Sequence, residues 1–429
     1  MQPTQNSSIQ AWSGRGLAAI SLILAAQCTP GTSTADGFRN PPEGAASIGG
    51  ATYRRAHVDD PSAVTLNPAN MADKTGREWQ YTASLGYAKR TFTGPTGLKE
   101  KSREPWGYLP SLHMIWPIED TRYVAGLAVT VPFGRSSKWQ RDVSFGTSSP
   151  YFAQLAVVNI NPTIATRINE ELTVAAGASL YYSVLKFRQF FPWAAVTGSP
   201  ADPTGVADFD GDGFSFGVNG AVTWTPSDNH TLALVVRSPF DVDYDGDFSV
   251  SDVPAAVAPL GVTSTSDFDS QIKYPTTVAL GYGYKINERA RVEFDVEWIE
   301  HSRNKTIPID IKNNTVLLPT PGVPQDYNDN WTFGVSVDYV LNETWTARGG
   351  VMHIQTPTPT STTIPVASEE DQEIISVGAT YDGEIYGVDL GYAYGNFSGR
   401  DVTDNLNPAV NGEYDADAHF ISASIRRSF

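Results

Sequence analysis

Residues 79–89 read WQYTASLGYAK, and their alternation indicates how the chain folds. Apolar residues occupy every second position from Trp79 to Tyr87, whereas the positions between them are polar or small. A period of two is typical of a β-strand with one apolar and one polar face. Residues 291–298 repeat the pattern with four charged side chains on the polar face. We expect water beside that charged face, and lipid or a protein core beside the apolar one.

Fourteen such segments follow one another after about residue 78. Their cores are 79–89, 108–117, 122–132, 155–167, 172–186, 213–225, 230–244, 271–285, 290–301, 330–340, 345–355, 373–381, 385–397 and 418–429. Six connections are short turns rich in Asn, Asp, Pro and Gly, and they alternate strictly with seven long ones. Bacterial outer-membrane barrels have this alternation of short periplasmic turns and long extracellular loops, with an even strand number. The sequence therefore predicts an all-β fold, a transmembrane antiparallel β-barrel of about 14 strands over residues 78–429.

The composition of the 429 residues excludes several classes of protein. The formal charge of −17, from 30 basic and 47 acidic residues, argues against a nucleic-acid partner, because such binders present a basic face. Aromatic residues make up 11% of the chain, which is too many for intrinsic disorder. A single cysteine excludes an intrachain disulfide framework and a thiolate metal cluster.

The first 35 residues have the pattern of an export signal. Arg15 precedes the apolar run GLAAISLILAA at 16–26, which is too short to span a bilayer as a helix. Small residues at Ser33 and Ala35 place the expected cleavage after Ala35. Cys28 directly follows the apolar run and is an alternative site of lipid attachment, although Gln27 before it fits that role poorly.

Residues 36–77 show no strand alternation and are dense in Ala, Gly, Pro and Asp. They fit either a periplasmic tail or a hatch that plugs the lumen, since a barrel of this width is otherwise an open pore. Four motifs in this segment, in order, resemble the hatch of the FadL-type outer-membrane transporters. They are Gly37-Phe38, ASIGGA at 46–51, DDPSA at 59–63 and NPANM at 67–71, within which Asn67, Pro68 and Ala69 match the family's NPA triplet.

The resemblance implies a function and a mechanism. The family takes up long-chain fatty acids and, in its toluene-uptake relatives, aromatic hydrocarbons. It implies passive, hatch-gated diffusion of a hydrophobic molecule through a plugged barrel, with lateral release through the wall beside a kinked strand. Pro132 and Gly134, near the end of the third strand, are the candidates for that opening, because proline removes a ladder donor. The alternative for Pro132 is that it simply ends the strand. The alternative function is a general diffusion porin or structural barrel with a periplasmic tail.

Two groups of residues are candidates for ligand binding. The aromatic group fits an acyl or aryl ligand or, alternatively, an interfacial girdle; the basic group fits a fatty acid carboxylate or, alternatively, ordinary ion pairs in the lumen. The aromatic residues are Phe187, Phe190, Phe191 and Trp193, and the basic residues are Arg188, Arg237, Lys273 and Arg348.

Other motifs do not indicate a metal, a cofactor or an enzyme. Asp241, Asp243, Asp245, Gly246 and Asp252 have the spacing of a calcium loop, but apolar residues alternate with the carboxylates, as in a strand that rises into a loop. There is no G-x-S-x-G nucleophile motif, and the histidines show no ligand pairing.

The expected surroundings of the chain are those of a bacterial outer membrane. The terminal Phe429 ends an alternating strand, which is how such barrels present themselves to the barrel assembly machinery. The acidic loops suggest divalent ions that bridge to lipopolysaccharide. The remaining partners that we expect are membrane lipid and a hydrophobic small-molecule ligand.

Overall fold

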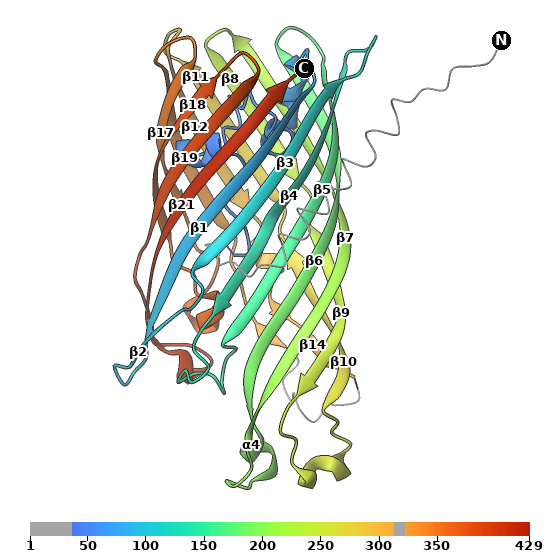
Figure 1. Cartoon of the computed structure of the whole chain (residues 1–429), viewed down its shortest axis with the longest axis vertical. Helices are drawn as coiled ribbons and strands as arrows, with labels where there is room; N and C mark the ends of the chain where they lie inside the picture. Colours follow the sequence, from blue (N-terminus) through green and yellow to red (C-terminus); the bar gives the residue numbers. More distant parts are fainter. Residues whose placement is uncertain (1–36, 313–321) are drawn as a thin grey trace, which may run out of the picture.

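The computed structural model describes residues 37–312 and 322–429, and it confirms the predicted barrel of fourteen antiparallel strands (Figure 1). The ring closes where β1 pairs with β21 along its whole length. The strands are β1 (Glu78–Thr93), β3 (Trp106–Pro117), β4 (Tyr123–Lys138), β5 (Phe152–Arg167), β6 (Leu172–Pro192), β7 (Thr204–Ser227), β8 (His230–Arg237) with β9 (Phe240–Val250), β10 (Thr265–Tyr274) with β11 (Thr277–Lys285), β12 (Ala290–Ile299), β16 (Asn330–Val340), β17 (Trp345–Ile354), β18 (Gln372–Asp382), β19 (Tyr386–Phe397) and β21 (Gly412–Ser428). The predicted signal peptide and Cys28 lie outside the described residues.

Short elements occupy the N-terminal segment and the long connections. The N-terminal segment contains α2 (Ala45–Gly50), α3 (Ala63–Leu66) and η1 (Pro68–Asp73). The connections contain β2 (Lys99–Lys101), α4 (Trp193–Thr197), η2 (Ala255–Leu260), η3 (His301–Arg303), β13 (Thr306–Ile307), β14 (Ile309–Ile311), β15 (Val323–Pro324), η4 (Thr360–Thr362), η5 (Pro365–Ala367), β20 (Arg400–Val402) and η6 (Pro408–Val410). Within the described residues, no helix has the length and apolar character needed to cross a membrane.

Two of the predicted strands are interrupted. The segment 230–244 is broken at Ser238-Pro239, and the segment 271–285 is broken at Pro275-Thr276. The two breaks lie side by side, because Arg237 pairs with Thr277 on one side of them and Phe240 pairs with Tyr274 on the other. Proline has no N–H to donate to a ladder, which explains both positions. Beyond the breaks, β6, β7, β9, β10 and β14 continue into an extension that carries α4 at its far end (Figure 1).

The two faces of the strands follow the predicted alternation. On β1, Leu85 points outward and is 46% exposed, whereas Gln80 and Ser84 are buried toward the lumen. On β12, Phe294 is 45% exposed, whereas Glu293, Asp295 and Glu297 are buried. The expectation of water beside these carboxylates is therefore wrong, because the N-terminal segment packs against them.

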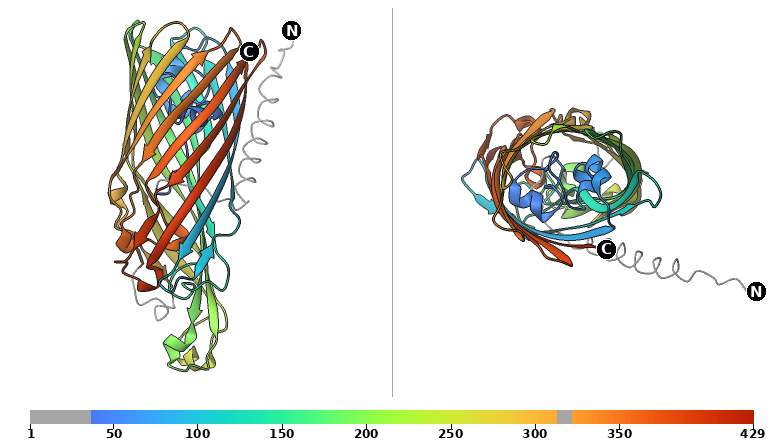
Figure 2. Two further views of the ribbon diagram at one scale, coloured as in Figure 1. Left: turned by 90° about the vertical axis from the view of Figure 1, so that its left-hand side faces the viewer. Right: turned by 90° about the horizontal axis from the view of Figure 1, so that it is seen from above.

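The described part of the N-terminal segment lies inside the ring of strands (Figure 2). Helix α2 packs on β17, β18 and β19, and η1 packs on β4 to β7. Glycines allow the backbone of α2 to approach the wall closely: a Cβ at Gly49 would lie 2.7 Å from the Cα of Gly378, and a Cβ at Gly391 would lie 2.3 Å from the carbonyl oxygen of Ala45. The segment is thus fitted to this part of the wall.

Candidate functional site

The carboxylates of β12 hold residues 54–57 of the N-terminal segment. The backbone N–H groups of Ala56 and His57 donate to the two oxygens of Glu293, at 2.8 and 3.0 Å. Arg55 and Arg39 both pair with Glu297, at 3.1 and 2.5 Å. Since these groups are buried, removing one partner of any of these contacts would leave an uncompensated charge or an unpaired donor in the lumen.

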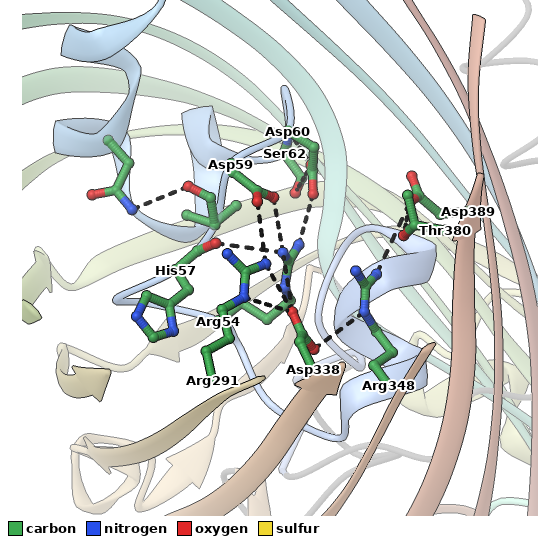
Figure 3. A network of polar contacts seen from close by, with 12 residues as sticks. Arg54, His57, Asp59, Asp60, Ser62, Arg291, Asp338, Arg348, Thr380 and Asp389 are labelled. Atoms are coloured by element: carbon green, nitrogen blue, oxygen red, sulfur yellow. Dashed lines mark hydrogen bonds and ion pairs between the residues drawn. The ribbon is translucent and has the colours of Figure 1, made fainter. Parts of the chain in front are cut away.

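A second polar network surrounds Arg54 (Figure 3). The guanidinium of Arg54 donates to Asp60 at 2.8 Å and to Asp59 at 2.9 Å, and it lies 4.0 Å from Asp338 on β16. Burial by itself raises the pKa of Asp60, but Arg54 and the hydrogen bonds from Ser62 together hold the pKa below its ordinary value. Arg291 on β12 donates to Asp338 at 2.8 Å and to Asp59 at 3.1 Å. The network therefore joins the N-terminal segment to the wall.

The triplet Asn67, Pro68 and Ala69 lies at the start of η1. The Asn67 side chain accepts a hydrogen bond from the N–H of Ala69 at 3.2 Å and so caps η1, and Pro68 occupies the first turn, where no N–H is needed. The Asn67 amide also donates to the Arg55 carbonyl at 2.6 Å and to Thr223 of β7 at 2.8 Å. The triplet thus connects the backbone at Arg55 to strand β7 of the wall.

The ladder between β3, β4 and β5 is irregular around Pro132. The β3–β4 pairing ends at Leu112 and Val129, and the β4–β5 register shifts between Thr130 and Phe133. This is a β-bulge, in which Val131 and Pro132 of β4 lie opposite one residue of β5. Strand β4 nevertheless continues to Lys138, so the alternative that Pro132 simply ends the strand is wrong.

The start of the N-terminal segment pairs with this bulge. Asn40 donates its backbone N–H to the Pro132 carbonyl at 2.9 Å and its side-chain amide to the Val131 carbonyl at 2.7 Å. The N–H of Gly134 donates to the Phe38 carbonyl at 2.7 Å. Residues 38–40 therefore take some of the backbone hydrogen bonds that a neighbouring strand would otherwise supply.

A small cavity adjoins this interrupted stretch of wall, and a larger cavity lies next to the small one. The smaller is lined by residues of β1, β3 and β4, namely Ser84, Leu109, Pro110, Ser111 and Val131, and by Pro41 to Gly44 of the N-terminal segment. The larger has mainly apolar walls from α2, β17, β18, β19 and β21. The two cavities share Pro41, Pro42, Ile48 and Phe420 in their linings, so they are neighbours.

An aromatic cluster fills the lumen beside Phe38. We call it the lumen aromatic cluster, and its rings are Phe38, Phe133, Tyr181, Phe240, Tyr244, Tyr274 and Tyr327. Phe240 stacks on Tyr181 and on Tyr274, with ring centroids 3.7 and 4.5 Å apart. Phe38 lies 5.8 Å from Tyr327 and 6.3 Å from Tyr274. Phe38 of the N-terminal segment thus occupies an apolar position in the lumen, of a kind that suits a hydrophobic ligand.

The aromatic residues predicted to bind ligand lie elsewhere, in the core of the extension. Phe187 stacks on Phe209, with centroids 4.1 Å apart. Phe190 stacks on Tyr151 at 4.8 Å, and Phe191 contacts Trp193 at 4.7 Å. Trp193 is fully buried, and its indole N–H donates to the Ser251 carbonyl at 2.9 Å. Packing of the extension accounts for these residues, and the cavities described here do not include them.

The four basic candidates divide between the two sides of the wall. Arg237 is in the lumen, where it donates to the Thr65 carbonyl and lines a third cavity beside Arg55. Arg348 is buried 3.4 Å from Asp338. The lumen-facing position expected of the other two is wrong. Arg188 pairs with Asp208 on the exposed face of the extension, and Lys273 is exposed on the face opposite Tyr274.

The acidic motif that begins at Asp241 lies on strand β9. Asp241 pairs with Arg303 at 3.1 Å, and Asp243 accepts from Gln271 at 2.6 Å. Apolar neighbours of these residues, such as Val242, point into the lumen aromatic cluster. Across residues 37–312 and 322–429, no three acidic, His or Cys side chains are grouped to hold a metal ion.

The comparisons with known proteins agree with this geometry. Residues 26–429 match the family described as outer membrane protein transport protein (OMPP1/FadL/TodX). The long-chain fatty acid transport protein of Salmonella typhi is 23% identical over 383 residues, which cover 82% of this chain and 85% of the relative. The protein of the same name from Escherichia coli (strain K12) is 22% identical over 394 residues, which again cover 82% of this chain and 85% of the relative.

Solved structures share the fold. A FadL homologue from Pseudomonas aeruginosa superimposes with a TM-score of 0.81 at 20% identity, covering 92% of this chain and 100% of that one. The toluene transporter TodX of Pseudomonas putida gives a TM-score of 0.70 at 16% identity, covering 91% and 99%. The family match spans nearly the whole chain and the relatives are transport proteins. This chain therefore belongs to the OMPP1/FadL/TodX family of outer-membrane transport proteins, and it is not an enzyme.

Proposed function

We propose that this protein takes up hydrophobic molecules, long-chain fatty acids or hydrocarbons, by passive diffusion with lateral release through the wall. The observation that carries the proposal is that the β3–β4 ladder stops at Val129 although β4 continues. A small cavity lies beside this interruption, and a larger apolar cavity adjoins the small one. The proteins similar to this chain include a long-chain fatty acid transport protein and a toluene transporter. A hydrophobic molecule that leaves sideways enters lipid and never needs an aqueous pore.

In this proposal, residues 36–77 act as a hatch and residues 38–40 act as its movable edge. Asn40 holds the bulge through carbonyl groups of Val131 and Pro132, whereas residues 54–57 are anchored by the carboxylates of β12. Displacement of Phe38 from the lumen aromatic cluster frees both an apolar site and the backbone groups around Gly134. The anchored part keeps the lumen filled meanwhile, which favours gated transport over a general diffusion porin.

The proposal predicts uptake without steady ion current. The test uses a bacterial host that has an outer membrane but lacks its own fatty acid transporter. Cells that express this protein should take up more radiolabelled oleate or toluene than cells that carry the empty vector. The purified protein should give no large steady current in planar bilayers, because the hatch fills the lumen. Large steady currents with no gain in uptake of either compound would contradict the proposal and favour the porin.

A further inference from the structure

The small cavity beside the interrupted β3–β4 ladder contains a single charged side chain. The register that ends at Leu112 and Val129 would place Pro110 opposite Val131, and both of these residues line the cavity. We call it the exit cavity, because a molecule that leaves through the interruption passes it. Among the described residues of its lining, Glu43 alone carries a charge, and the others are apolar residues, a glycine and two serines.

The neighbours of Glu43 in the chain fix its position. Two prolines at 41–42 restrict the backbone between Glu43 and Asn40, which is bonded to the bulge of β4. Gly44 has a φ of +91°, in the left-handed region, and a Cβ at this residue would lie 3.3 Å from the Ser62 Oγ. The backbone is thus constrained on both sides of Glu43, and the docked segment holds its carboxylate beside the interruption.

The charge of Glu43 is not offset inside the exit cavity. Its carboxylate forms no hydrogen bond or ion pair with the residues that the structure describes. Glu43 also lines the third cavity, where the other charged residues are Arg39, Arg55, Arg237 and Glu297. Arg237 interacts with Glu43 electrostatically there, but at more than ion-pair distance. A ligand anion that moves from the third cavity into the exit cavity thus leaves three arginines and meets a carboxylate.

The larger cavity, which adjoins the exit cavity, is also poorly suited to an anion. Arg39 is the one charged residue in the described part of its lining. The guanidinium of Arg39 already pairs with Glu297 at 2.5 Å and lies 4.4 Å from the centroid of the Tyr53 ring. The rest of the wall is mainly apolar, so this cavity suits a molecule without a charge.

From this arrangement, and resting on the function proposed above, we propose that Glu43 determines specificity at the lateral exit: it favours release of uncharged hydrophobic molecules and disfavours ionised carboxylates. A ligand carboxylate beside Glu43 would bring two like charges together between mainly apolar walls, where water screens them poorly. A hydrocarbon or a long-chain alcohol avoids this repulsion. The substrate class that this exit favours is therefore the uncharged one, a hydrocarbon rather than a fatty acid anion.

The test compares uptake of an anion and of a neutral molecule that share one hydrocarbon tail. Cells that express the full-length protein are given radiolabelled oleate or oleyl alcohol at pH 8, where oleate is ionised. Glu43→Gln should raise the initial rate of oleate uptake about tenfold, because it removes the repulsion, and change that of oleyl alcohol less than about twofold. The amide has nearly the size of the carboxylate, and no hydrogen bond or ion pair to a described residue is lost.

Two control variants separate the charge of Glu43 from other effects. Glu43→Asp keeps the negative charge, so the ratio of oleate uptake to oleyl alcohol uptake should stay within about twofold of the parent ratio. Glu119→Gln removes an exposed carboxylate that pairs with Arg77, and it should leave both rates unchanged. Heat-modified mobility on gels would verify that each variant is folded. Recording in planar bilayers would show whether Glu43→Gln opens the hatch to ions.

The outcomes separate this inference from the proposed function. Equal gains in oleate and oleyl alcohol uptake in Glu43→Gln, a gain accompanied by steady ion current, or an unchanged oleate rate would each overturn the role of Glu43. Uptake of oleyl alcohol or toluene by the parent protein would still support the proposed function in all three cases. Failure of the parent protein to increase uptake of oleate, oleyl alcohol and toluene over the empty vector would instead contradict the proposed function.

Discussion

Deletion of Pro132 will lower uptake of the transported molecule about tenfold or more and leave the barrel folded, because it removes the bulge. In the structure, Val131 and Pro132 lie opposite the single residue Val158, between the pairs Thr130–Asn159 and Phe133–Val157. Without Pro132, each residue of β4 in this stretch lies opposite one residue of β5. Thr130 and Phe133 then become inward-facing positions two residues apart, as in a regular strand. The β3–β4 ladder can then extend past Val129 and close the wall.

The control for this deletion is Pro132→Ala. The substitution keeps the residue count, so the bulge and the bonds of Asn40 to Val131 and Pro132 remain possible, and uptake should stay close to that of the parent protein. Uptake of radiolabelled oleate or toluene by whole cells is the measurement, with heat-modified gel mobility as the test of folding. A folded deletion variant with the parent's uptake rate would show that the molecule leaves by another route.

The strands themselves could be predicted from the sequence because lipid imposes a simple rule. Every backbone group must be paired within the barrel, and every second side chain meets lipid, so the alternation at residues 79–89 or 291–298 is directly visible. The prolines at 239 and 275 interrupt ladders without interrupting the alternation, which is why both breaks were missed. The extension was also missed, since its outward positions carry Asp208, Asp210 and Asp212 in place of apolar residues.

The contacts of the lumen could not be predicted in the same way. The NPA triplet pointed to residues 67–69, but the partners of this segment come from strands more than a hundred residues away, such as Thr223 and Glu293. A usable signal was present: arginines at 39, 54 and 55 and acids at 293, 295 and 297 are complementary in charge.

Replacing Arg54 by Met will destabilise docking of the N-terminal segment and produce ion-conducting openings. Arg54 is buried, and it supplies the only positive charge within hydrogen-bond distance of Asp60 in the described residues. Removing one partner of a buried ion pair costs about 3–5 kcal/mol, because the other charge remains buried and uncompensated. If that cost falls on the docked state, the ratio of displaced to docked segments rises by about two to four orders of magnitude.

The double variant Arg54→Met with Asp60→Asn distinguishes charge from packing. It removes both buried charges, so the docked segment no longer holds an unpaired carboxylate, and much of the lost stability should return. Single-channel recording in planar bilayers should therefore show frequent openings for Arg54→Met and few for the double variant or for Arg77→Gln. Asp60 also accepts from the N–H of Ser62 at 2.9 Å, a bond that the asparagine oxygen can still accept. Equal opening in the single and double variants would mean that the Arg54 side chain holds the segment by packing and by its bonds to Asp59 and the His57 carbonyl, not by neutralising Asp60.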